Sequence, residues 1–263
     1  MSKLITIIGG RDKSGNVEAV ESLQIESGEI YSIVGFTGSG KSQLISDIEQ
    51  MAQGDTVTGR QILIDGKAPD YSTRYNPDLK LVAQLSQNMN FALEMEVRDF
   101  LILHAESRGI VSTEKMISEI MACVNSLAGE AVMESDILTR LSGGQSRALM
   151  IADVAIISNS PIILVDEIEN AGIDRRKAMQ LLTGRGKIVL IVTHDPQLAL
   201  IGEKRIVMKN GGMDKIIDLT KDEKLAEAVL DQFTTAILNT QNKIRSGENI
   251  TKADLILREE VLC

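Results

Sequence analysis

The glycine-rich segment Gly35-Phe36-Thr37-Gly38-Ser39-Gly40-Lys41-Ser42 constrains the fold of this 263-residue chain more than any other stretch. It matches the pattern G-x-x-x-x-G-K-[ST] of phosphate-binding loops. Strand-forming residues precede it at 29–34, and residues 43–51 carry apolar side chains at helical spacing. A glycine turn between a strand and a helix points several backbone N–H groups and the positive end of the helix dipole at one anion. The segment therefore predicts a nucleotide phosphate site.

Two side chains of this loop have specific expected roles. Lys41 should reach the β- and γ-phosphates of the nucleotide, and Ser42 should hold Mg²⁺. A chance glycine turn is the alternative, and the matching flanks on both sides argue against it. The other loop residues expected to contact the nucleotide are Gly35, Thr37, Gly38, Ser39 and Gly40.

Charge and composition argue against several classes of protein. The 28 basic and 37 acidic residues give a net charge of −9, so the chain lacks the basic surface typical of a nucleic-acid binder. Aromatic residues make up only 3% of the chain, which also disfavours stacking on single strands. Cys123 and Cys263 show no metal-ligand spacing, and a reduced cytosolic setting is expected.

Membrane segments are not expected in this sequence. Its first residues carry no long apolar signal region, and no run approaches the ~18 apolar residues of a membrane span. If the protein works at a membrane, we expect a partner to supply the spans.

Short apolar runs predict the strands of a sheet. The near-continuous runs at 161–167 and 187–194 are typical of parallel strands covered on both faces. Further strands are expected at 4–8, 60–66 and 79–85, and a closing hairpin around Asn210-Gly211-Gly212.

Helical spacing dominates from about residue 91. A stripe expected to pack in the core, with Gly129 as a C-cap, consists of Ile117, Ile120, Met121, Val124 and Leu127. Thr220 and Glu223 fit a capping box that begins another helix. We expect one face of that helix to pack on the protein's own core, with a partner contact as the alternative; its residues are Leu225, Val229, Phe233 and Ile237.

A second motif, Leu141-Ser142-Gly143-Gly144-Gln145, lies between the helical region and the strand that ends in Asp166-Glu167. With the phosphate loop, Gln87 after one apolar strand and His194 after another, the sequence resembles the ATP-binding cassette (ABC) ATPases over about residues 1–219. The resemblance implies an α/β fold: a RecA-like P-loop NTPase core, an N-terminal antiparallel β part and an inserted helical subdomain at 88–140. Residues 220–263 would form a C-terminal helical extension.

The resemblance also implies a division of chemical roles for ATP hydrolysis. Asp166 and Gln87 would contact Mg²⁺, Glu167 would act as general base, and His194 would bond the γ-phosphate. Members of the family work as head-to-tail dimers, so the signature of one chain would contact ATP held by the other. The signature residues are Ser142, Gly143, Gly144 and Gln145, and Asp174 would lie across the same interface.

Three positions depart from the family pattern. The adenine-stacking aromatic would fall near Arg11–Lys13, where no residue is aromatic, and the guanidinium of Arg11 is a candidate substitute. Ile168 stands where a proline is usual, and Asp153 stands where transporter members commonly have an arginine. None of these changes removes a catalytic group.

The function expected first is the ATPase subunit of a membrane transporter, cytoplasmic and held at the inner face of the membrane by a separate permease. Its partners would be ATP, Mg²⁺ and a second copy or a related chain. The alternative is a soluble ABC-type ATPase that remodels or assembles a protein or metallocluster partner. A DNA-repair ATPase is disfavoured, because the stretch between Ser42 and Ser142 is too short for a long coiled coil.

Overall fold

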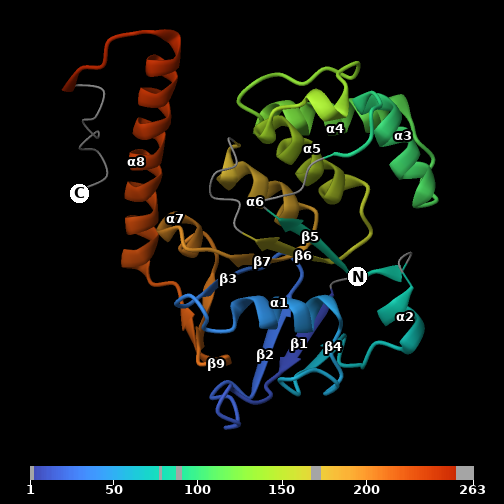
Figure 1. Ribbon diagram of the computed structural model, residues 1–263, viewed down its shortest axis with the longest axis vertical. Coiled ribbons are helices and arrows are strands. Elements are labelled where there is room, and N and C mark those ends of the chain that lie inside the picture. Colours follow the sequence, from blue (N-terminus) through green and yellow to red (C-terminus); the bar gives the residue numbers. More distant parts are fainter. Residues whose placement is uncertain (1–2, 77–78, 87–90, 167–172, 253–263) are drawn as a thin grey trace.

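The computed structural model describes residues 3–76, 79–86, 91–166 and 173–252. Its centre is a six-stranded sheet in the order β5-β6-β7-β3-β8-β9 (Figure 1). Five of the strands run parallel, and β9 pairs antiparallel with β8 in the expected closing hairpin. The strands are β3 (Ile30–Val34), β5 (Val82–Ser86), β6 (Ile162–Asp166), β7 (Ile188–Val192), β8 (Lys204–Lys209) and β9 (Gly212–Asp218).

A smaller antiparallel sheet lies beneath the first, in the order β2-β1-β4. It consists of β1 (Leu4–Ile8), β2 (Ser22–Glu26) and β4 (Gln61–Ile64). Helix α1 (Lys41–Glu49) lies between the two sheets, and its Leu44 and Ile48 share one buried cluster with strand residues of both (Figure 1). The phosphate loop at the start of α1 is therefore fixed from two sides.

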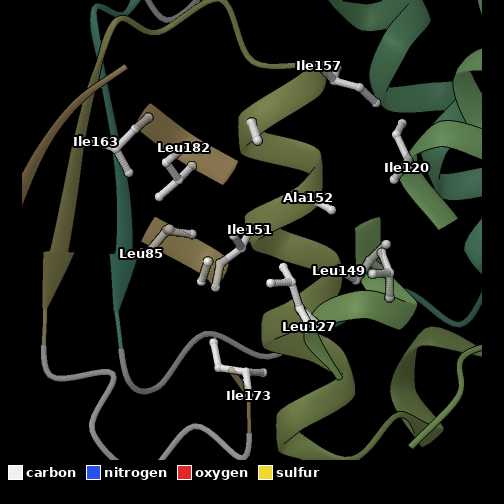
Figure 2. Close-up of a cluster of buried hydrophobic side chains, with 14 of the residues drawn as sticks. Leu85, Ile120, Leu127, Leu149, Ile151, Ala152, Ile157, Ile163, Ile173 and Leu182 are labelled. Carbon is white, nitrogen blue, oxygen red and sulfur yellow. The ribbon is translucent and has the colours of Figure 1, made fainter. Parts of the chain in front are cut away.

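The helical part of the chain covers the other face of the large sheet. Its core cluster joins α3 (Val97–Ser107), α4 (Glu114–Leu127), α5 (Gly143–Ile156) and α6 (Arg175–Gly184) to strand residues. Figure 2 shows Leu85, Ile163 and Leu182 on one side of α5 and Ile120 on the other. Helix α5 thus ties the helical part to the sheet.

The apolar stripe on α4 is buried along its whole length, which confirms its predicted place in the core. The predicted glycine cap is wrong. Helix α4 ends at Leu127, Ala128 adopts an extended conformation and bridges to Ile173, and Gly129 does not have a positive φ. A strand-like contact therefore ends this helix where a left-handed turn was expected.

The remaining helices are short, apart from the last. They are α2 (Tyr71–Tyr75), the 3-10 helix η2 (Leu138–Arg140), α7 (Pro196–Ala199) and α8 (Lys221–Ser246). The predicted antiparallel β part and helix-covered parallel sheet are both present, so the expected α/β fold class is confirmed. Within the described ranges, no helix has the length and apolar character needed to cross a bilayer.

Helix α8 begins at the predicted capping box, in which Thr220 and Glu223 bond each other's backbone N–H groups. Its expected packing on the protein's own core is wrong. The predicted apolar face is largely exposed: Leu225 is 60% exposed, Phe233 49% and Ile237 52%. The helix stands beside α7 at one side of the molecule (Figure 1), and its single buried residue is the polar Glu227.

Candidate active site

The chemical motifs of the sequence meet at one edge of the parallel sheet. Ser86 at the end of β5 lies beside Asp166 of β6, and Asp166 lies beside Val192 of β7. Val192 in turn neighbours Ile33 of β3, one residue before the strand ends. Ligands of open α/β sheets bind outside the carboxyl ends of the strands. The phosphate loop, Asp166 and the Thr193-His194 segment therefore begin at adjoining points of a single edge.

The phosphate loop needs its glycines because other backbone lies against them. Gly35 and Gly40 have φ angles of 151° and 102°. A Cβ on Gly35 would lie 2.6 Å from the carbonyl oxygen of Met208, and one on Gly40 would lie 2.6 Å from the Cα of Gly211. The strand β8 and the turn that follows it therefore pack directly against the phosphate loop.

Two contacts brace the loop from segments far away in the sequence. The Gly211 N–H donates to the Ser39 carbonyl at 2.8 Å, and the Lys13 ammonium donates to the Gly38 carbonyl at 2.7 Å. The sequence predicted the turn at Gly211 but gave no signal that the turn supports the phosphate loop. Such contacts depend on tertiary packing, which local patterns do not encode.

The polar groups of the loop fit a nucleotide phosphate. The Lys41 ammonium is largely buried and donates to the carbonyls of Gly35 and Phe36 at 2.8 and 3.3 Å. The buried hydroxyl of Ser39 has no hydrogen-bond partner, and Ser42 is exposed at the first turn of α1. A buried cation and an unpaired hydroxyl beside a helix N-terminus suit an anionic ligand.

The donor set also fits Mg²⁺ bound together with phosphate. No group of three or more His, Cys, Asp or Glu side chains suited to a metal occurs among the residues that the structure describes. Mg²⁺ typically takes one or two carboxylates, and substrate phosphates and water complete its octahedron. Ser42 and Asp166 would supply one hydroxyl and one carboxylate, which matches that requirement.

The signature motif forms the N-terminus of α5. The Ser142 hydroxyl accepts from the Gln145 N–H at 3.3 Å, and the Gln145 side chain accepts from the Ser142 N–H at 2.9 Å. Gln145 also donates to the Ala131 carbonyl at 2.9 Å, which fixes the loop before the helix. The helix packs on α4 and α6, so the signature belongs to the helical part of the chain rather than to the phosphate loop.

A charged pair connects two further predicted elements. Asp174 caps α6 by accepting from the Lys177 N–H, and the next residue, Arg175, donates to Asp195 at 2.7 Å. Asp195 caps α7 and directly follows His194. The segment carrying Asp174 is therefore bonded to the segment carrying His194, a link that the sequence did not reveal.

A pocket of about 330 Å³ lies beside the loop where the base was expected. It is lined by Arg11, Asp12, Lys13, Gly40, Gln43, Val57, Thr58 and Gly211. The Arg11 guanidinium donates to the Gly15 carbonyl at 2.8 Å. Burial acts to raise the pKa of Asp12, but hydrogen bonds from Asn16, Asn210 and Ser14 outweigh it and hold that pKa below its usual value.

Asp153, which stands at the position of a common transporter arginine, joins two helices of the helical part. Its side chain lies 2.7 Å from the His104 ring of α3 and is mostly buried. This contact gives His104 a structural role between α3 and α5. The predicted site residues Gln87 and Glu167, together with Ile168, lie outside the described residues.

Comparison with known proteins identifies the family. The family model described as "ABC transporter" matches residues 20–170. This chain is an ABC-type ATPase. An uncharacterized ABC transporter ATP-binding protein of Methanocaldococcus jannaschii is 53% identical over 255 residues, covering 97% of each chain.

Solved structures of other ABC cassettes resemble this ATPase in fold. The structure of cbiO1 from Clostridium perfringens, described as part of the ABC transporter complex cbiONQ, covers 86% of this chain and 94% of its own, with 22% identity and a TM-score of 0.62. An ATP-binding cassette solved as a dimer in a post-hydrolysis state, bound to ADP and phosphate, has 26% identity. It covers 84% of this chain and 99% of its own, with a TM-score of 0.56.

Proposed function

We propose that this ABC ATPase hydrolyses ATP at composite sites shared by two copies in a head-to-tail dimer. The observation that carries the proposal is the separation of the motifs into two groups. The phosphate loop, Asp166 and His194 start at one sheet edge, whereas Ser142 caps a helix that packs on α4 and α6. A second copy would bring its signature to the phosphate that the first copy holds.

Within one site, Lys41 and the N–H groups of the loop would hold the β- and γ-phosphates. Glu167, the residue after Asp166, would orient the attacking water and take its proton, and His194 would bond the γ-phosphate. Mg²⁺ held by Ser42 and Asp166, with Gln87 beside it, would neutralise charge on the phosphates. The contact between Arg175 and Asp195 supports coupled movement of the interface segment and the His194 segment.

We further propose that the partner acted on is a separate membrane permease, docked beside Gln87. The family match and the relationship to ABC transporter ATP-binding proteins support this partner over a soluble one. Purification of the tagged protein from detergent-solubilised membranes of its own cells should bring down a multi-span subunit. Recovery of a soluble metalloprotein in its place would favour the alternative of cluster assembly.

The test of the composite site is Glu167→Gln. Glutamine keeps the size of the side chain but cannot accept the proton, so hydrolysis should fall by roughly 10²–10⁴. ATP should still bind, and two chains should be trapped around it as a dimer on size-exclusion chromatography with Mg-ATP. Adding Ser142→Arg should abolish that dimer by filling the space of the partner's γ-phosphate. Hydrolysis at the wild-type rate by the Glu167→Gln chain would remove Glu167 from the mechanism.

A further inference from the structure

Helix α8 carries a mostly apolar seam that is largely exposed among the residues that the structure describes. The seam consists of Leu230, Phe233, Ile237, Thr240 and Ile244, spaced three and four residues apart in alternation. That repeat places all five side chains on one side of a helix and is typical of a surface that packs against a second helix. Phe233, Ile237 and Ile244 are about half exposed or more, whereas Leu230 and Thr240 are half-buried, so three of the five positions are open to contact among the described residues.

Polar contacts hold α8 in place by a different side. Gln197 of α7 donates to Asp231 at 2.7 Å and accepts from the Thr234 hydroxyl at 3.0 Å. Arg176 of α6 lies 3.8 Å from Glu227, whose side chain is largely buried. The two helices that hold α8 follow directly after His194 and Asp174. The seam is therefore presented in a fixed orientation next to the segments assigned to the dimer interface.

The composition around the seam suits burial in an interface. Residues 234–242 include no charged side chain, although a quarter of the whole chain is charged. The centres of protein interfaces are depleted of charged residues, because desolvating a charge is costly. The uncharged stretch on α8 therefore differs from the charged composition of the rest of this acidic protein, and its composition suits a buried contact.

We propose that the seam of α8 packs against α8 of a second copy in the ATP-bound dimer, antiparallel and with the two-fold axis near Ile237. Acidic side chains predominate in the first half of α8, and Lys243 and Arg245 lie in its last turn. Antiparallel pairing brings the acidic half of each copy beside the basic end of the other, and the two-fold symmetry of an isologous contact makes this pairing twice. The inference rests on the proposed dimer, of which this contact becomes a second part.

The size of the seam makes the contact an addition to the nucleotide interface. From Leu230 to Ile244 the helix rises by about 21 Å, at ~1.5 Å per residue. One helix pair of that length buries less than the ~1,200 Å² typical of a stable interface, so it would not hold two chains together without ATP. It would lower the dissociation constant of a dimer that ATP has already assembled.

The test is a disulfide across the two-fold axis. Ile237→Cys is placed in a full-length chain that carries Glu167→Gln and in which Cys123 and Cys263 are replaced by serine. With Mg-ATP and a mild oxidant, most of the protein should run as a covalent dimer on a non-reducing gel, and the yield without nucleotide should be several-fold lower. Thr235→Cys is the matched control, because Thr235 is exposed on the opposite side of the helix and should not cross-link.

Ile237→Asp in the Glu167→Gln chain supplies an independent readout. It should raise the dissociation constant of the ATP-bound dimer at least tenfold and leave the melting temperature of the monomer unchanged, since Ile237 is exposed there. A dimer that forms normally with Ile237→Asp, and does not cross-link through Cys at 237, would overturn the α8 contact and leave the composite site intact. Absence of any ATP-dependent dimer would overturn both proposals.

The natural Cys263 provides a test of whether the C-terminal residues of the same chain occupy the seam in place of a second copy. If residues 253–263 of the same chain cover the seam, Ile237→Cys in a chain that keeps Cys263 should give a disulfide within one monomer. Peptide mass spectrometry would detect that product, and its predominance with Mg-ATP would overturn pairing between copies.

Discussion

Replacing Arg60 by methionine should destabilise this protein more than any surface charge change. Arg60 is fully buried between the small sheet and α1. It donates to Asp47 at 2.8 Å and to the Gly211 carbonyl at 2.9 Å, and it also pairs with Glu18. Methionine fills much of the space but leaves two buried carboxylates without their cation.

The expected loss follows from that burial. Removing one partner of a buried ion pair typically costs about 3–5 kcal/mol, because a charge stays buried without compensation. For a chain of this size, each kcal/mol shifts the melting temperature by roughly 2–4 °C, so a fall of roughly 10 °C is expected. Urea and thermal unfolding of the nucleotide-free protein, followed by circular dichroism, would measure it. ATP binding should weaken as well, since Arg60 holds the carbonyl of the Gly211 that braces the phosphate loop.

Arg98→Met is the matched control. Arg98 pairs with Glu134 at 2.6 Å and with Glu114, but at the protein surface, where such pairs contribute about 0–1 kcal/mol. Adding Glu18→Gln and Asp47→Asn to Arg60→Met should recover part of the loss by removing the buried charges. A loss for Arg60→Met no larger than that for Arg98→Met would refute this account of the network.

Three further changes give defined outcomes. Lys41→Ala should weaken Mg-ATP binding by about 10–100-fold in calorimetry, since a charge-assisted contact contributes ~1.5–3 kcal/mol. Gly40→Ala should weaken ATP binding and lower stability together, because its Cβ would collide with Gly211. Gly66→Ala is the control, since Gly66 also has a positive φ but open space around it, and it should show only the backbone strain of about 1–2 kcal/mol. Burial raises the pKa of Glu227. Above that pKa the ionised carboxylate therefore lowers the free energy of unfolding, and this loss of stability disappears as the pH falls through the pKa. Glu227→Gln should therefore add about 1 kcal/mol of stability at pH 8, and the gain should shrink in acid; a gain that is constant with pH would contradict it.

The parts of the fold that the sequence predicts are those encoded by local patterns. The apolar runs of β6 and β7 identify parallel strands covered on both faces, and both are buried as expected. The glycines of the phosphate loop, the capping box at Thr220 and the turn at Asn210-Gly211 have residue requirements that can be read within a few positions. The placement of the phosphate loop, Asp166 and His194 along one sheet edge follows from the order of the strands in the sheet.

The features that the sequence does not predict depend on contacts between distant segments. Arg60 directly precedes β4, in a stretch predicted as a strand, and the sequence does not show that Glu18 and Asp47 approach it and pair with it in the interior. The cap expected at Gly129 was displaced by the bridge between Ala128 and Ile173. The apolar face of α8 was expected in the core because a period of 3.6 identifies a packed face but not the surface that covers it.

The claim that two copies share each site is tested most directly by mixing two inactive chains. The Lys41→Ala chain retains an intact signature, and the Ser142→Arg chain retains an intact phosphate loop. In an equal mixture with random pairing, half of the dimers are mixed and each has one working site, so about a quarter of the wild-type ATPase rate should return. A mixture no more active than either chain alone would contradict the composite site and place each complete site within a single chain.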